Sequence, residues 1–280
     1  METILPTTIL PTTTHPVWIV GAGPGDPDLI TLRGQKILAM ADVVVYAGSL
    51  VPESLLAHCQ PQAERLDSRS LVLEEMVAMI SERVAAGQKV VRLQDGDPCL
   101  YGALQELLRE LQQRQIAVEI VPGVSAFQLA AARLQVELTI PERVQTIILT
   151  RANGRTHVPP KEELASLAAH QASLCLYLSA HHCRAACQQL LAHYPADTPI
   201  AICYRLGWPD EQVILGSLVE MADLTQQQQL TRTVLYVISP ALAEATPQRS
   251  RLYSQEHAHL FRPSRPQSSP REGYSARKAE

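Results

Sequence analysis

Short apolar runs alternate with amphipathic stretches through the first half of the chain. Runs of this kind, rich in β-branched residues, are typical of strands, and four are predicted, at residues 17–20, 43–46, 89–93 and 117–121. Over residues 71–86 the apolar positions recur at helical spacing, at Leu73, Met76, Val77, Ile80 and Val84. Strands that alternate with helices indicate an α/β fold with a parallel sheet.

A second series of apolar runs follows Pro141. It predicts five more strands, at residues 145–150, 173–178, 199–204, 211–216 and 233–238. Only two good helices, at about 160–170 and 180–193, separate these strands, which favours a mixed sheet. The pattern therefore predicts two α/β domains, residues 16–141 and 142–240, with a ligand site in the cleft between them.

The two ends of the chain differ in composition from the rest. Residues 1–15 are rich in Thr and Pro, and residues 241–280 are rich in Pro, Ser, Gln and Arg. Segments with so few apolar residues cannot bury enough surface to offset the entropy lost on ordering. We expect a disordered N-terminal extension, 1–15, and a disordered tail, 241–280.

Overall composition limits the classes of function. The 280 residues are 46% hydrophobic, enough for a sizeable core, and 24 basic residues face 28 acidic ones. No global positive charge favours nucleic acid or anionic lipid, so neither is expected as a partner. Six scattered cysteines without a CxxC pair fit a reducing cytoplasm. We expect no signal peptide and no membrane span, because the start lacks a basic flank and no run of about 18 apolar residues occurs.

A glycine-rich loop follows the first predicted strand. Gly21, Gly23 and Gly25 allow the backbone to turn sharply and approach a ligand, which first suggests a dinucleotide site. Two features oppose a nicotinamide oxidoreductase. Asp26 stands where the third glycine of that motif belongs, and Asp42 precedes the second strand instead of ending it.

Four more segments stand where predicted strands end. They are residues 44–53, 93–103, 120–127 and 148–159. Strand ends of an α/β sheet share one edge, so these loops are expected to form one pocket. Gly96 before Asp97 makes a tight exposed turn able to hold a polar ligand, and Gly123 with Ser125 does the same from the next strand.

In this order the loops resemble the tetrapyrrole methylase family, from Val17 to Pro240. Several segments are similar to members that methylate carbon 11 of precorrin-4 or of its cobalt complex in cobalamin biosynthesis: YAGSL (46–50), LEEM (73–76), LTIP (138–141), LTRANGRTHVP (149–159) and WPDE (208–211). The resemblance implies a class III methyltransferase with two α/β domains, a homodimer, and a folded S-adenosyl-L-methionine in the cleft. Any cobalt would arrive inside the tetrapyrrole substrate.

The resemblance also implies a set of cofactor contacts. Matching motifs place them at Pro24, Asp95, Gly96, Asp97, Leu100, Ser125, Ala126, Leu178 and Leu206. Asp95 replaces the small residue usual at the start of the GDP loop, His157 replaces a Pro, and Ser239 replaces a Gly. The uroporphyrinogen-III methyltransferases have an Asp, their proposed base, where this chain has Ala47, which argues against that activity.

No general base is identified from the sequence. Tyr46 and Ser49 are candidates only for orienting the substrate. A substrate with many carboxylates needs local positive charge, and the candidates near strand ends are Arg92, Arg151, Arg155 and Arg205. Cys183 and Cys187 lie one helical turn apart but are expected to be buried core cysteines, so no metal site is predicted.

Three alternatives stay open. One is a methylase of this fold that acts on another corrin carbon, on ribosomal RNA or on a protein side chain; the acidic balance disfavours the RNA substrate. The second is a nicotinamide oxidoreductase, weakened at Asp26 and Asp42. The third is a non-catalytic relative that only binds ligand.

Overall fold

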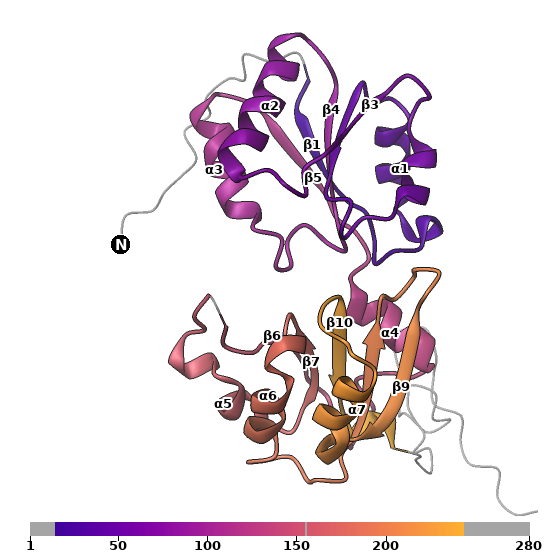
Figure 1. Ribbon diagram of the computed structural model, residues 1–280, viewed down its shortest axis with the longest axis vertical. Coiled ribbons are helices and arrows are strands. Elements are labelled where there is room, and N and C mark those ends of the chain that lie inside the picture. Colours follow the sequence, from indigo (N-terminus) through magenta and orange to yellow (C-terminus); the bar gives the residue numbers. More distant parts are fainter. Residues whose placement is uncertain (1–14, 155, 244–280) are drawn as a thin grey trace, which may run out of the picture.

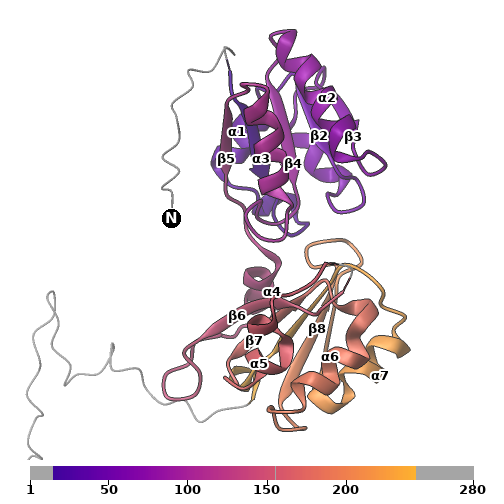
Figure 2. The same ribbon diagram turned by 90° about the vertical axis from the view of Figure 1, so that its left-hand side faces the viewer.

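Two five-stranded sheets, each with helices on both faces, form the protein. The computed structural model describes residues 15–154 and 156–243. Figures 1 and 2 show the two sheets in separate bodies that follow each other along the longest axis of the molecule. The expected architecture of two α/β domains is therefore confirmed.

The first sheet is entirely parallel, in the order β3-β2-β4-β1-β5. Its strands are β1 (Val17–Gly21), β2 (Val43–Tyr46), β3 (Glu64–Asp67), β4 (Val90–Gln94) and β5 (Val118–Val121). Four of them were predicted. Edge strand β3 was missed because its sequence, ERLD, has none of the apolar run that marks the others; it pairs with β2 alone.

Helices cover both faces of this sheet. They are α1 (Leu32–Leu38), α2 (Leu73–Ala85) and α3 (Leu104–Gln113). Successive residues of a strand point to opposite faces, so Trp18 and Val20 pack in the core on the α1 side while Val17 and Ile19 pack on the α2 and α3 side. Burial on both faces explains why these strands are continuous apolar runs.

The second sheet is mixed, as predicted, in the order β6-β7-β10-β8-β9. Only β6 and β7 pair in parallel; the other pairs are antiparallel. The strands are β6 (Ile147–Arg151), β7 (Ser173–Tyr177), β8 (Pro199–Tyr204), β9 (Gln212–Ser217) and β10 (Val234–Ile238).

Three helices pack on one face of the second sheet: α5 (Leu164–Ala168), α6 (Cys183–Leu190) and α7 (Met221–Gln227). The first two lie within the predicted helical stretches. The hydrophobic pattern does not predict α7. Its polar, glutamine-rich sequence hides the buried positions Met221, Ala222 and Thr225, which become recognisable only once the helix docks on the sheet.

The other face of the second sheet is covered by α4 (Ala126–Leu134). Leu129 and Ala130 are buried in a core that includes Cys175, Cys203 and Val237 of the second sheet. By packing, α4 therefore belongs with the second sheet although it lies within the predicted first domain, 16–141. The two cores separate after β5, earlier than the composition break near residue 141 suggested.

The second domain also extends beyond its predicted end. A short 3-10 helix, Pro240–Leu242, buries Ala241 and packs Leu242 against the α4 core. Arg143 Nη1 donates hydrogen bonds to the carbonyl oxygens of Pro240, at 3.2 Å, and Ala243, at 2.9 Å. The predicted start of the tail at residue 241 is therefore too early, because residues 241–243 belong to the second domain. The remainder of the two expected extensions, 1–14 and 244–280, lies outside the described residues.

Two truncations test this revised boundary. Ending the chain after Ala243 should preserve thermal stability, because the composition of residues 244–280 predicts little buried apolar surface. Ending it after Pro240 removes Ala241, Leu242 and one acceptor of Arg143, and should cost about 1 to 3 kcal/mol. Thermal and urea unfolding of both proteins would measure the difference. Equal stability of the two truncations would show that the residues 241–243 contribute nothing.

Candidate functional site

The carboxyl edge of the first sheet faces the second domain (Figure 2). The loop after β1 meets the turn after β8, and both contain a glycine at the contact. A Cβ on Gly25 would lie 2.5 Å from Cδ1 of Trp208 and 2.7 Å from the carbonyl oxygen of Leu206. A Cβ on Gly207 would overlap the backbone nitrogen of Asp26. A side chain is excluded at both glycines, so their backbones lie directly against the other domain, with the Trp208 side chain packed on Gly25.

A second set of glycines joins the loops after β1, β4 and β5. Gly96 N donates to the Gly23 carbonyl at 2.8 Å, and Gly23 N donates to the Gly96 carbonyl at 3.2 Å. A Cβ on Gly21 would stand 2.5 Å from Cα of Gly123 and 2.8 Å from the carbonyl oxygen of Gly96. The three loops therefore form one continuous backbone ledge, which we call the glycine ledge: Gly21, Gly23, Gly96 and Gly123.

One side of this ledge is open. Gly96 has a left-handed φ of +57°, and a Cβ built on it would meet only Cα of Ser125, at 3.9 Å. At Gly21 and Gly123, in contrast, backbone atoms of the neighbouring loops already occupy the space that a Cβ would need. A ligand can thus approach the main chain at Gly96 as closely as backbone contact allows.

Two aspartates flank Gly96 and have different surroundings. Asp97 accepts hydrogen bonds from Cys99 N, at 2.8 Å, and from Gly123 N, at 2.9 Å, so its side chain holds the turn and ties it to the next loop. Asp95 keeps an accessible carboxylate although many protein atoms surround it. That crowding raises its pKa, and the nearby charge of Arg92 partly opposes the rise.

Two tyrosines that the sequence analysis did not select line the junction. The hydroxyl of Tyr177, at the end of β7, lies 2.9 Å from Ser125 Oγ and accepts a hydrogen bond from Phe127 N at 3.1 Å. Burial raises the pKa of Tyr177 to about 12, so it stays neutral at physiological pH. The ring of Tyr101, from the loop before α3, lies 5.4 Å from that of Tyr177. In the sequence, only the position of Tyr101 after the GDP loop and of Tyr177 at a strand end could have indicated that they line a site.

The two predicted leucines occupy different environments. Leu178 is 68% exposed and has a left-handed φ of +52°, whereas Leu206 is 4% exposed and packs in the α4 core. Tyr101, with φ +58°, and Arg205, with φ +46°, share this backbone region. Left-handed conformations are costly for such residues and gather at functional sites, which supports a site at this junction. Three more of the predicted contacts, Pro24, Leu100 and Ala126, are partly exposed and lie within a few residues of the glycine ledge in the sequence.

A pocket of about 290 Å³ lies at the ends of β2 and β4, and Ser49, Ser68, Arg69 and Arg92 are among its lining residues. Arg92 Nη1 donates to Ser68 Oγ at 3.1 Å and to the Val45 carbonyl at 3.3 Å, while its buried Nε has no hydrogen-bond partner among the described residues. Burial lowers the pKa of Arg92. This wall of the pocket presents a desolvated cation.

The loop that carries Ser49 is held by an aspartate. Asp67 accepts a hydrogen bond from Gly48 N at 3.0 Å and pairs with Arg69, and the hydrogen bond from Arg69 lowers the pKa of Asp67 to about 2. Tyr46 instead packs against the core on the α1 side and does not line this pocket. The structure therefore separates the two candidate orienting residues.

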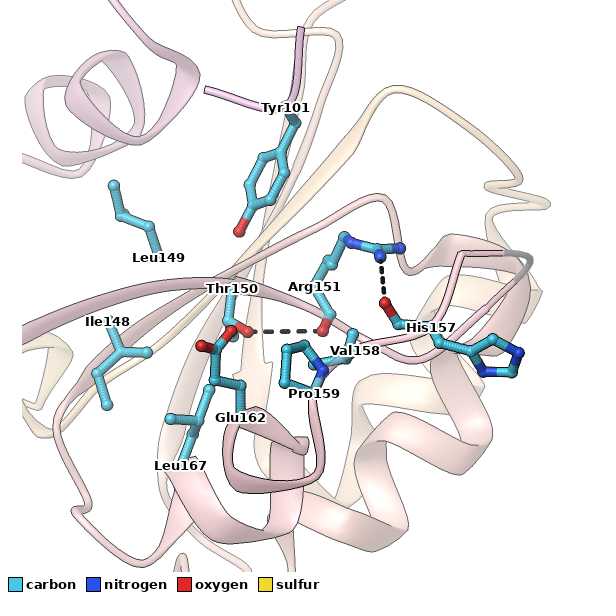
Figure 3. A pocket seen from close by; sticks show the side chains of 10 residues that line it. All are labelled: Tyr101, Ile148, Leu149, Thr150, Arg151, His157, Val158, Pro159, Glu162 and Leu167. Atoms are coloured by element: carbon cyan, nitrogen blue, oxygen red, sulfur yellow. Dashed lines mark hydrogen bonds between the residues drawn. The ribbon is translucent and has the colours of Figure 1, made fainter. Parts of the chain in front are cut away.

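A second pocket, of about 370 Å³, lies between the domains (Figure 3). Tyr101 lines it from the first domain, and β6 with the segment after it contributes Thr150, Arg151, His157 and Glu162. Arg151 Nη2 donates to the carbonyls of Thr156, at 2.9 Å, and His157, at 3.3 Å. Figure 3 shows the guanidinium turned toward the carbonyl of His157, so Arg151 stabilises the loop that follows β6.

The predicted arginines do not share one pocket. Arg92 and Arg151 line different pockets, and Arg205 stacks 4.1 Å from the Trp208 ring centroid and pairs with Asp210 at 3.1 Å. Arg155 lies outside the described residues. Sequence proximity to strand ends selected these cations, whereas their side chains take directions that a sequence pattern does not contain.

The six cysteines are free thiols, and Cys183 and Cys187 are buried beside the carbonyls of Met221 and Leu218. Within residues 15–154 and 156–243, no group of three potential ligands could hold a metal ion. The helices of the same residues include none long and apolar enough to span a bilayer.

Comparisons with known proteins agree with this architecture. The cobalt-precorrin-4 C(11)-methyltransferase of Methanocaldococcus jannaschii is 42% identical over 249 residues, 89% of this chain and 96% of that protein. The precorrin-4 C(11)-methyltransferase of Pseudomonas aeruginosa is 42% identical over 88% of this chain and 98% of its own length.

Solved structures extend the comparison. A cobalt precorrin-4 methyltransferase described as a cobalamin biosynthetic enzyme superimposes with a TM-score of 0.79, at 41% identity, covering 81% of this chain and 96% of its own. The uroporphyrin-III C-methyltransferase of Thermus thermophilus complexed with S-adenosyl homocysteine gives 0.69 at 26% identity, covering 84% and 98%.

The sequence profile named Tetrapyrrole (Corrin/Porphyrin) Methylases matches residues 16–222. This range contains the glycine ledge, both pockets and the junction of the two domains. Together with relatives that align over nearly their whole length, the match shows that the chain belongs to the tetrapyrrole methylase family.

Proposed function

We propose that this protein transfers a methyl group from S-adenosyl-L-methionine to carbon 11 of precorrin-4 or cobalt-precorrin-4, in cobalamin biosynthesis. The observation that carries the proposal is 42% identity, over nearly full length, to two relatives with this activity in their names. The names of the two relatives differ in whether the substrate contains cobalt, and the proposal covers both the cobalt-free and the cobalt-containing substrate. Ala47, with no carboxylate to act as a base at that position, sets this chain apart from the uroporphyrinogen-III enzymes.

The glycine ledge fits the methyl donor. The open face of Gly96 allows a ligand to approach the main chain closely, and the exposed side chains of Leu178 and Tyr101 offer apolar surface for an adenine ring. Asp26 accepts a hydrogen bond from Asp28 N at 3.0 Å, which keeps an anion at the turn where a dinucleotide would place its pyrophosphate. This fits a nucleoside without phosphate groups better than NAD.

The proposed donor contacts come from both domains. In the first they are Pro24 and the GDP-loop residues Asp95, Gly96, Asp97 and Leu100. Ser125 and Ala126 lie at the start of α4, which connects the two domains. In the second they are Leu178 and Leu206. The burial of Leu206 leaves its backbone as the accessible part, and the side chain of Asp97 supports the turn.

When bound, the donor supplies an electrophilic methyl group on a positively charged sulfur. The protein has to hold that group in line with a nucleophilic carbon and keep water out. Correct placement of two reactants can supply about 7 to 11 kcal/mol, more than one general base. The rigid ledge provides such placement on the donor side. Tyr46 and Ser49 are proposed only as groups that orient the substrate.

The acceptor carries several carboxylates, and we propose that arginines around the junction bind them. Arg92 presents an incompletely paired, desolvated guanidinium in the pocket of about 290 Å³, which a carboxylate would complete. Arg151 lines the pocket between the domains. Arg205, and Arg155 beyond the described residues, are proposed as further contacts at the same edge.

The proposal includes a cytoplasmic homodimer. Six free cysteines fit a reducing compartment. The dimer is implied by the family resemblance, and the exposed Val213 and Leu215 of edge strand β9 are surfaces that association could cover.

Product analysis tests the activity itself. The purified protein is incubated with S-adenosyl-L-methionine and, separately, with precorrin-3, precorrin-4 and cobalt-precorrin-4. We expect a mass gain of one methyl group with one or both precorrin-4 forms and none with precorrin-3. Methylation of a different acceptor would instead indicate a methylase of this fold with another substrate. Binding without turnover would indicate a non-catalytic relative that only binds ligand.

Gly96→Val tests the donor site. The added side chain would fill the open face of the ledge, so S-adenosylhomocysteine affinity should fall by at least about tenfold. Gly87→Val is the matched control, because Gly87 also has a positive φ, +75°, and open space around its Cβ position, but lies in a distant turn. Equal affinity in a folded Gly96→Val protein would remove the donor from this ledge.

Arg151→Ala tests the acceptor site. A charge-assisted hydrogen bond contributes about 1.5 to 3 kcal/mol, so tetrapyrrole affinity should weaken by roughly tenfold to a hundredfold. S-adenosylhomocysteine affinity should hardly change. Lysine at this position keeps the charge but loses the planar fork and should restore only part of the loss. If the donor is what Arg151→Ala or Arg155→Ala loses, this loop serves the other ligand.

A further inference from the structure

Four carboxylates, those of Asp26, Asp28, Asp95 and Asp97, lie along the loops of the glycine ledge, and those of Asp26 and Asp97 are already in use. Asp26 caps its own turn through Asp28 N, at 3.0 Å. Asp97 gives one oxygen to Cys99 N and the other to Gly123 N, at 2.8 and 2.9 Å. Asp95, directly before Gly96, differs from both, because its carboxylate has no hydrogen-bond or ion-pair partner among the described side chains.

Asp95 lies one residue beyond the end of β4 and directly before Gly96 of the ledge. It follows β4, the central strand, whose last residue lies opposite Gly21 of β1. Arg92 and Gln94 line the pocket of about 290 Å³, whereas Leu93 packs in the core on the α1 side and Asp95 does not line that pocket.

The surroundings compensate this anion only in part. The Asp95 side chain is exposed, but neighbouring protein atoms desolvate its carboxylate enough to raise its pKa. Arg92 is the cation that acts on it, but its Nη1 is directed to Val45 and Ser68. A partly desolvated carboxylate that no side chain pairs is costly, and a cationic ligand lowers that cost.

We propose that Asp95 determines specificity for the charged methyl donor: its carboxylate faces the sulfonium and makes the site prefer the donor over the neutral product of transfer. This inference rests on the proposed function. It goes further by assigning to a side chain a discrimination that the backbone ledge cannot make, because the donor and its demethylated product share every other group.

Charge balance through the reaction explains the preference. The carbon–sulfur bond breaks as the new carbon–carbon bond forms, and the electron pair of the broken bond stays on sulfur, which becomes neutral. The methylated macrocycle takes up the positive charge and returns to its former charge by releasing a proton to water. Asp95 then has no cation to face, which favours release of the product.

Asp95→Asn tests the inference by removing the charge at nearly constant shape. Calorimetry on the full-length protein measures the dissociation constants of S-adenosyl-L-methionine and S-adenosylhomocysteine. We expect the first to weaken on the order of tenfold and the second by less than about twofold. In turnover the loss should appear mainly in the KM for the donor, since an interaction made in the ground state acts on binding.

Asp197→Asn is the matched control, because it removes the same charge from an exposed turn before β8, at the end of the strand remote from the junction. It should leave both constants unchanged. Asp95→Ser is a second variant that also lacks the charge and should show the same altered ratio.

The outcomes separate the two proposals. If the unmodified protein binds neither nucleoside, the proposed function fails. If it binds both and Asp95→Asn leaves their ratio unchanged, or weakens both equally, Asp95 does not face the sulfonium and the inference is overturned while the proposed function stands.

Discussion

Backbone contact between Gly21, Gly96 and Gly123 is the constraint on which the site depends. A Cβ at Gly21 or Gly123 would stand 2.8 Å or less from main-chain atoms of another loop, so the loops after β1, β4 and β5 can converge only without side chains. Convergence leaves Gly96 with one open face. The same contact therefore closes the sheet edge and provides the surface on which a ligand can rest.

The second domain is joined to this edge by similarly specific contacts. Gly25 and Gly207 permit the close approach of two turns, and the Tyr177 hydroxyl meets Ser125 and Phe127 at the start of α4. Because α4 packs on the second sheet while its chain comes directly from β5, the helix is a rigid connection between the two halves.

Charge is distributed unevenly around the junction. Asp67 and Arg69 neutralise each other and hold a loop, and Asp97 is satisfied by two amides. Arg92 and Asp95 are different, since each is partly desolvated and incompletely paired within the described chain. Incompletely paired groups are expensive in a purely structural role, and they are the ones that a charged donor and an acidic acceptor could complete.

The sequence by itself determined the strands of continuous apolar residues, the mixed character of the second sheet and the glycine-containing loops at the strand ends, because these depend on local periodicity and on glycine at turns. Tertiary structure alone decided the rest. Strand β3 forms by pairing with β2, and helix α7 forms because the second sheet buries residues such as Met221 in an otherwise polar segment. Packing assigned α4 to the second core, brought Tyr101 beside Tyr177, and sent Arg92 and Arg151 into different pockets. Side-chain direction and contacts between distant segments arise from three-dimensional packing, which no local pattern in the sequence specifies.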